Sequence, residues 1–88
     1  MDEKCMICIA DDGSVQWIMD TDDPNKIIDE LAREIGMKFD DVSENLEVWS
    51  IPLSYEKVEF IVDSFGINEA GKLLLMLKGS KLVRPKGG

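Results

Sequence analysis

Two short hydrophobic segments near the start of the chain have the residue pattern of β-strands. Residues 5–10 and Val15–Met19 are separated by Asp-Asp-Gly-Ser, four residues that favour turns. A turn this short joins strands that run in opposite directions. We therefore predict that the chain opens with a β-hairpin.

The hydrophobic positions of the next segment have the spacing of one helical face: Ile27, Ile28, Leu31, Ala32 and Ile35. Asp23 can cap this helix, Pro24 suits its first position, and Gly36 can end it. The polar stretch 37–45 is predicted to be a loop. Hydrophobic alternation resumes over residues 46–51, which indicates a third strand.

The second half of the chain predicts one more helix and two more strands. Ser54 can cap a helix that Gly66 ends, and its hydrophobic stripe is Val58, Ile61, Val62 and Phe65. The continuous hydrophobic run 73–77 favours a central strand, with a helix as the open alternative for so short a segment. Gly79-Ser80 suits a tight turn into a last strand at 82–83. The order ββαβαββ predicts an α+β fold, with a single mixed sheet of about five strands and two helices.

Length and composition favour one small folded domain. The chain has 88 residues, of which 44% are hydrophobic and 32% are charged, as is typical of globular proteins. We expect residues 1–88 to form a single, monomeric domain with residues 85–88 as a flexible tail. The hydrophobic run 5–10 is too short for a signal peptide or a membrane span. We therefore expect a cytoplasmic protein that does not bind membranes.

Cys5 and Cys8 have the Cys-x-x-Cys spacing of redox and zinc sites, but they lie in the first predicted strand. Residues three apart on a strand point to opposite faces, so these thiols are not expected to form a disulfide or to share a metal ion. The chain has no histidine, which excludes Ser-His and Cys-His nucleophiles. A single chain also has too few ligands for a zinc site, which would need a second subunit. Carboxylates in polar turns lack the apolar cleft that acid–base catalysis needs, so we expect a protein that is not an enzyme.

Acidic residues are concentrated in the first half of the chain. Residues 1–45 hold thirteen Asp and Glu against four Lys and Arg, whereas residues 46–88 hold five against six. The net charge of −8 therefore arises from the first half. This charge repels phosphate groups and argues against nucleic-acid binding. It attracts cations, so a divalent cation is the expected partner and a basic protein is the alternative.

Two clusters of acidic residues are candidate metal sites. The first helix and the second strand both span roughly 18–20 Å, so a helix packed back across the hairpin would bring its C-terminus and the following segment to the hairpin turn. The first cluster, at that turn, comprises Asp11, Asp12, Asp40, Asp41 and Glu44. The second cluster, at the opposite end of the hairpin, comprises Asp2, Glu3, Asp20, Asp22 and Asp23. Turn formation and helix capping are the alternative roles of these residues.

Carboxylate oxygens without histidine or paired thiolates select Ca²⁺ or Mg²⁺ over zinc or copper. We expect calcium, with magnesium as the alternative, because the six to eight ligands of calcium tolerate irregular loops. An EF-hand is excluded, since a loop starting at Asp20 has Asn25 instead of glycine at its sixth position and Leu31 instead of glutamate at its twelfth. A site assembled from separate loops is expected to be weak, with a dissociation constant of roughly 10⁻⁴–10⁻³ M.

Two resemblances add to these expectations. The segments MDEKC (1–5), WIMD (17–20) and KGSKLVRP (78–85) resemble a family of small acidic proteins of methanogenic archaea. This resemblance implies a compact α+β fold, an acidic ligand pocket and a tendency to bind calcium. Separately, the terminal Gly87-Gly88 and the ββα opening resemble ubiquitin-like sulfur carriers, which are activated at the terminal carboxylate. The alternative function is therefore that of a sulfur carrier or protein modifier.

Overall fold

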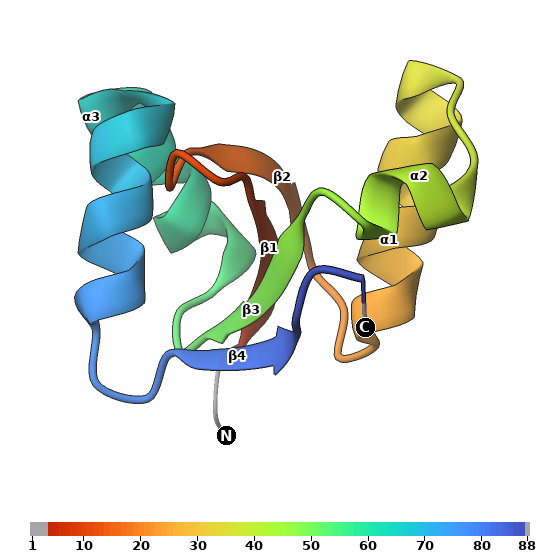
Figure 1. The fold of residues 1–88 in the computed structure, drawn as a ribbon. Coiled ribbons are helices and arrows are strands. Elements are labelled where there is room, and N and C mark those ends of the chain that lie inside the picture. Colours follow the sequence, from red (N-terminus) through yellow and green to blue (C-terminus); the bar gives the residue numbers. More distant parts are fainter. Residues whose placement is uncertain (1–3, 88) are drawn as a thin grey trace.

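The predicted hairpin forms the first two strands of an antiparallel sheet (Figure 1). In the computed structural model, which describes residues 4–87, β1 (Cys5–Ile9) pairs with β2 (Val15–Met19) on one side and with β3 (Glu47–Ile51) on the other. β3 in turn pairs with β4 (Lys81–Arg84). The strand order β2-β1-β3-β4 makes β2 and β4 the two edges of the sheet.

Helix α1 (Pro24–Ile35) begins and ends where the sequence predicts. The Asp23 side chain accepts a hydrogen bond from the backbone N–H of Asn25 at 2.9 Å. Gly36 ends the helix with a left-handed φ of 70°, a conformation in which glycine is favoured. A short helix, α2 (Phe39–Ser43), follows. Both helices pack against the same face of the sheet.

Helix α3 (Tyr55–Met76) covers the other face and is bent at Gly66. The Ser54 hydroxyl caps its start by accepting from a backbone N–H three residues later at 3.3 Å. β3 ends and β4 begins at the same end of the sheet, since Ser50 pairs with Lys81, so the connecting helix must run out and return. Gly66, with φ 82° and ψ 163°, makes this reversal, and Figure 1 shows the two arms of α3.

The predicted α+β class is confirmed, but the number and order of the elements are not. Residues 4–87 form four strands and three helices in the order ββααβαβ, instead of about five strands and two helices. Every strand pair is antiparallel, so the predicted mixed sheet is also wrong. Within the same residues, no helix is both long and apolar enough to span a bilayer.

Two segments differ from their predicted structure for identifiable reasons. The sequence favours a central strand for residues 73–77 and leaves a helix as the alternative; the alternative is correct, since these residues continue the second arm of α3 and its C-terminal cap. Only Leu74 in this run is fully buried, while Leu73 and Leu77 are exposed, which is the burial of one helical face. The predicted loop 37–45 contains α2, which is held to the core by its buried residue Val42.

The two faces of the sheet carry separate hydrophobic cores. On one face Met6 and Cys8 pack with α1 and α2, and on the other face Cys5, Ile7 and Ile9 pack with α3. All five residues of β1 are therefore buried. The predicted placement of the two cysteines on opposite faces is confirmed, and both are free thiols.

The turn between β1 and β2 lies against the second arm of α3. A Cβ atom at Gly71 would lie 1.9 Å from the backbone oxygen of Gly13, a distance that a methyl group cannot occupy. The absence of a side chain at Gly71 thus permits the contact. The same contact positions the turn that carries Asp11 and Asp12.

Candidate functional site

The first acidic cluster is divided between the β1–β2 turn and α2. In the turn, the Asp12 carboxylate accepts from the backbone N–H of Ser14 at 3.0 Å and from its hydroxyl. These hydrogen bonds lower the pKa of Asp12. Asp40 and Asp41 occupy the first turn of α2, and Glu44 caps its end. The carboxylates of Asp40 and Asp41 therefore lie near the helix N-terminus, where the helix dipole favours negative charge, whereas Glu44 lies at the opposite end.

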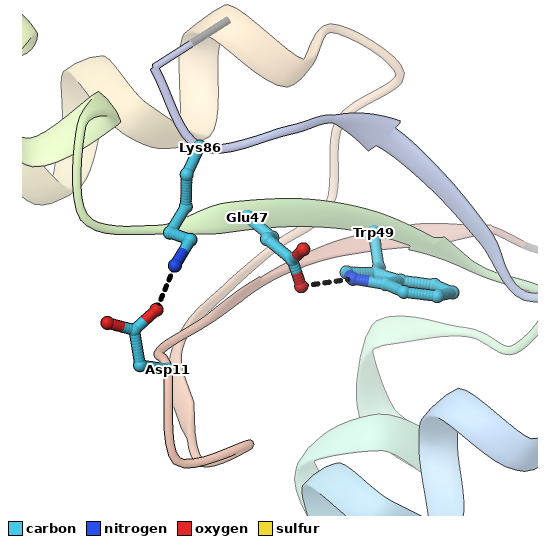
Figure 2. A network of polar contacts seen from close by, with 4 residues as sticks. All are labelled: Asp11, Glu47, Trp49 and Lys86. Carbon is cyan, nitrogen blue, oxygen red and sulfur yellow. Dashed lines mark hydrogen bonds and ion pairs between the residues drawn. The ribbon is translucent and has the colours of Figure 1, made fainter.

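Asp11 has a cation from its own chain. The Lys86 ammonium donates to the Asp11 carboxylate, as Figure 2 shows. Asp11 is the largest cause of the raised pKa of Lys86, and Glu47 raises it further. The Glu47 carboxylate also accepts from the indole N–H of Trp49 at 3.2 Å. The charge crowding that suggested a bound metal at this turn is thus offset by a lysine.

The C-terminal segment is attached at three points. The backbone N–H of Gly87 donates to the backbone oxygen of Ser43 at 2.9 Å. The Arg84 guanidinium lies 5.4 Å from the centre of the Phe39 ring. Together with the Lys86 ion pair, these contacts bring residues 84–87 to α2 and to the β1–β2 turn. The predicted flexibility of the tail stays a prediction.

The second acidic cluster is only partly brought together. Asp2 and Glu3 lie outside the described residues, and Asp23 caps α1. Asp20 and Asp22 line an open cleft of about 670 Å³, which we call the acidic cleft. The other residues of its lining are Lys4, Thr21, Ser54, Tyr55 and Glu56. Glu56, from the start of α3, is an acidic member that the sequence did not indicate.

Neither cluster forms a compact group of metal ligands in the part of the chain that the structure describes. Among residues 4–87, no three Asp, Glu or Cys side chains lie together so that they could hold a metal ion. The five carboxylates of the first cluster do not converge as the length argument predicted. Calcium binding, and the carboxylates that would hold the ion, stay predictions.

A mostly apolar groove lies between α1, α2 and β2, and we call it the α1–α2 groove. Its volume is about 390 Å³. Its apolar lining comes from Trp17, Leu31, Ile35, Met37, Val42 and Leu46. Ile35 and Met37 are 52% and 46% exposed, so hydrophobic surface remains open to solvent at this groove. Such surface is typical of a ligand-binding site.

The polar part of the α1–α2 groove is rich in hydrogen-bond acceptors. It comes from Gln16, Asp41 and Asn45. The Asn45 side-chain NH₂ donates to the backbone oxygen of Asp41 at 2.8 Å, and the Gln16 NH₂ donates to the Ser14 hydroxyl at 2.6 Å. The Asp41 carboxylate can only accept hydrogen bonds, and the two amide oxygens are further acceptors, so this lining suits a ligand that donates hydrogen bonds.

A second groove, the α3 groove, lies on the other side of β2. Its volume is about 230 Å³, and it is lined by residues 15–18 together with Tyr55, Val62 and Ile67. Gln16 and Trp17 line both grooves. The Trp17 indole N–H donates to the Glu30 carboxylate of α1 at 2.6 Å, which holds the ring in place. Trp17 thus connects two grooves on opposite faces of an edge strand.

Sequence reasoning concentrated on the carboxylates and missed these grooves. Two signals were available: β2 carries no charged residue, and Ile35 and Met37 flank Gly36 beyond the buried face of α1. Comparison of the chain with protein-family models, curated proteins and solved structures finds no match. The resemblance to small archaeal proteins therefore stays a prediction.

Proposed function

We propose that this protein is a binding module whose ligand combines an apolar group with a positively charged or hydrogen-bond-donating group, held in the α1–α2 groove. The observation that carries the proposal is the pairing of an apolar lining with acceptors and one formal charge, that of Asp41. The groove volume of about 390 Å³ lies within the range of ligand pockets, roughly 300–1,000 Å³.

The two parts of the groove have different roles in this proposal. Burial of apolar ligand surface supplies most of the affinity, at about 25 cal/mol per Å² before the cost of association is subtracted. Asp41 is exposed to solvent, so its charge contributes mainly to selection between cations and anions. A probe of nine non-hydrogen atoms should therefore bind weakly, with a dissociation constant on the order of 1 mM.

The test uses phenethylamine as the probe and 3-phenylpropionate as its control, because the two share an aromatic body and carry opposite charges. Amide NMR titration should show saturable shifts at the Trp17 indole N–H and the Asn45 side chain with the amine, and clearly weaker shifts with the carboxylate. Asp41→Asn should reduce this preference, whereas Asp40→Asn, with the same change in net charge, should not. Equal binding of both probes, or no saturable shift, would contradict the proposal.

Two functions expected from the sequence stay predictions beside this proposal. Calcium, or magnesium, binding involves Asp41 as well, so calcium should be absent from the probe titration. The sulfur-carrier alternative requires a free terminal carboxylate at Gly88, which lies outside the described residues. Intact-mass measurement of the protein from its native host, with and without active sulfur transfer, would reveal a thiocarboxylated or adenylated tail.

A further inference from the structure

We infer that the natural occupant is an extended segment of a partner protein, which adds to β2 as a fifth strand. The segment would have a short run of apolar residues flanked by Lys or Arg. This inference rests on the proposed function, because it uses the α1–α2 groove, and it extends the site across the edge of the sheet to the α3 groove. Strand addition supplies backbone hydrogen bonds, and the grooves supply selectivity.

The two edges of the sheet differ in their charge. β4 carries Lys81 and Arg84, and charged residues of this kind discourage pairing with another chain. β2 consists of Val-Gln-Trp-Ile-Met and carries no charge. A bulge at Gln16 interrupts β2, since Cys8 pairs with Trp17 and Ile9 with Val15. Residues 17–19 therefore form the regular part of this edge, to which an incoming strand can pair.

The grooves on the two sides of β2 match the geometry of a strand. Successive side chains of a strand point to opposite faces, and neighbouring strands lie about 4.8 Å apart. A segment beside Trp17 would therefore direct one side chain toward the α1–α2 groove and the next toward the α3 groove. Figure 1 shows β2 between α3 on one side and α1 with α2 on the other. A single apolar groove would accommodate only every second residue.

Charge complementarity indicates the flanking residues of the partner. The α3 groove shares Tyr55 with the acidic cleft, so Asp20, Asp22 and Glu56 continue the binding surface beyond the end of β2. Asp41 provides a negative charge in the other groove. The chain as a whole carries a charge of −8. A segment with Lys or Arg at its ends would be attracted to this surface, and an acidic segment would be repelled.

A second copy of this chain is the less favoured occupant. β4 itself has the pattern Lys-Leu-Val-Arg, but it is already part of the fold: it pairs with β3, and its Arg84 lies over Phe39. Pairing of β4 with β2 of another copy would also be head-to-tail and would produce open chains of molecules. The net charge of −8 also makes two copies repel each other. We therefore assign the occupant to a different protein, whose segment carries apolar residues flanked by Lys or Arg.

The experiment uses two capped peptides, Lys-Thr-Val-Ile-Val-Thr-Lys and Glu-Thr-Val-Ile-Val-Thr-Glu, with the intact protein. The basic peptide should shift the amide signals of 17–19 and slow hydrogen exchange at the outward-facing amides of β2, whereas phenethylamine should leave their exchange unchanged. The acidic peptide should bind at least about tenfold more weakly. Shifts confined to the α1–α2 groove, without exchange protection in β2, would overturn strand addition while leaving the proposed function intact.

A matched pair of variants tests the second groove. Ile67 lines the α3 groove and is 49% exposed, whereas Phe60 is 70% exposed on the same helix and lines neither groove. Ile67→Lys should weaken the basic peptide at least about tenfold and leave phenethylamine unaffected, and Phe60→Lys should change neither. Equal peptide affinity in both variants would overturn the inference. A molecular mass that increases with protein concentration in sedimentation, and no longer does so in Ile67→Lys, would overturn the inferred partner protein. The occupant would then be a second copy of this chain.

Discussion

The Lys86 ammonium forms an ion pair with the carboxylate of Asp11, a residue 75 positions earlier in the chain. Its backbone neighbour Gly87 bonds to Ser43 of α2. The end of the chain therefore reaches the β1–β2 turn, the acidic region for which the sequence suggested a metal ion. At this turn the protein has a positive charge of its own.

Removal of this ion pair should have a small, salt-dependent effect. Lys86→Gln should lower the melting temperature at low ionic strength more than Lys78→Gln, a control with the same charge change and an exposed side chain. Because both partners are exposed, the difference should vanish near 1 M salt, where the Debye length is about 3 Å. Asp11→Asn should remove the difference between the two lysine variants. A difference that persists in high salt would contradict an electrostatic role.

The same contact has a defined pH dependence. Asp11 raises the folded-state pKa of Lys86 above 10.5, so the stabilisation is fully present below pH 10.5 and is lost as the pH rises through the folded pKa. Wild type and Lys86→Gln should therefore converge in melting temperature in strongly alkaline solution. Cysteine ionisation acts on both proteins alike and does not affect this comparison.

Calcium binding at the first cluster should compete with Lys86. If Asp11 contributes to a calcium site, Lys86→Gln should raise calcium affinity, because the variant frees the carboxylate from its ammonium partner. Lys78→Gln provides the control for net charge. Amide NMR titration to about 10 mM calcium measures the calcium affinity of the two variants and of the wild type, since sites of this kind have dissociation constants of roughly 10⁻⁴–10⁻³ M. No saturable shift in any of these proteins would refute the calcium prediction, and shifts centred on Asp20 and Asp22 would assign it to the second cluster.

Gly71→Ala tests the contact between α3 and the β1–β2 turn. The new methyl group would lie 1.9 Å from the Gly13 oxygen, so the turn or the helix must move. We expect a loss of about 1–3 kcal/mol in the free energy of unfolding, as for other overpacked sites. The control Asn68→Ala, at an exposed position in the same arm, should change it by less than about 0.5 kcal/mol. A stable Gly71→Ala protein would show that the turn relaxes freely.

The two thiols should be unreactive in the folded protein. Burial raises the pKa of both Cys5 and Cys8 from 9.0 to about 12. Between these pH values the unfolded chain releases protons that the folded chain retains, so the free energy of unfolding should fall as the pH rises from about 9 to about 12. Thiol labelling near pH 8 should follow global unfolding in denaturant. Rapid labelling of the folded protein would contradict the burial of these residues.

The sequence predicts elements whose signals are local. The predicted bounds of α1 are correct to the residue. Asp23 favours the start of a helix because its side chain can cap it, and Gly36 favours the end because its backbone can adopt the left-handed conformation. The run 73–77 has no such marker, and its structure depends on Gly71 contacting a turn nearly sixty residues earlier. Gly66 predicts the end of a helix, and its φ and ψ are indeed not helical. The helix nevertheless resumes after Gly66, because the chain must return to the end of the sheet where β4 begins.

The candidate site depends on contacts that are more distant still. Length matching suggests which elements meet, but it does not show that Lys86 reaches Asp11 or that Asp12 is engaged by Ser14. The grooves arise where the edge of β2 meets three helices, and no single segment contains their pattern. Charge alone therefore predicted a cationic ligand, whereas the location of the two grooves depends on the fold.

The burial of every residue of β1 links the stability of the two halves of the molecule. Met6 and Cys8 belong to the core beneath α1, and Cys5, Ile7 and Ile9 belong to the core beneath α3. Neither core can therefore keep its packing if this strand leaves the sheet. A shift of β1 by one residue would exchange the side chains of the two cores at once. The two helical layers should consequently melt as one cooperative unit, and binding along β2, the direct neighbour of β1, would stabilise both together.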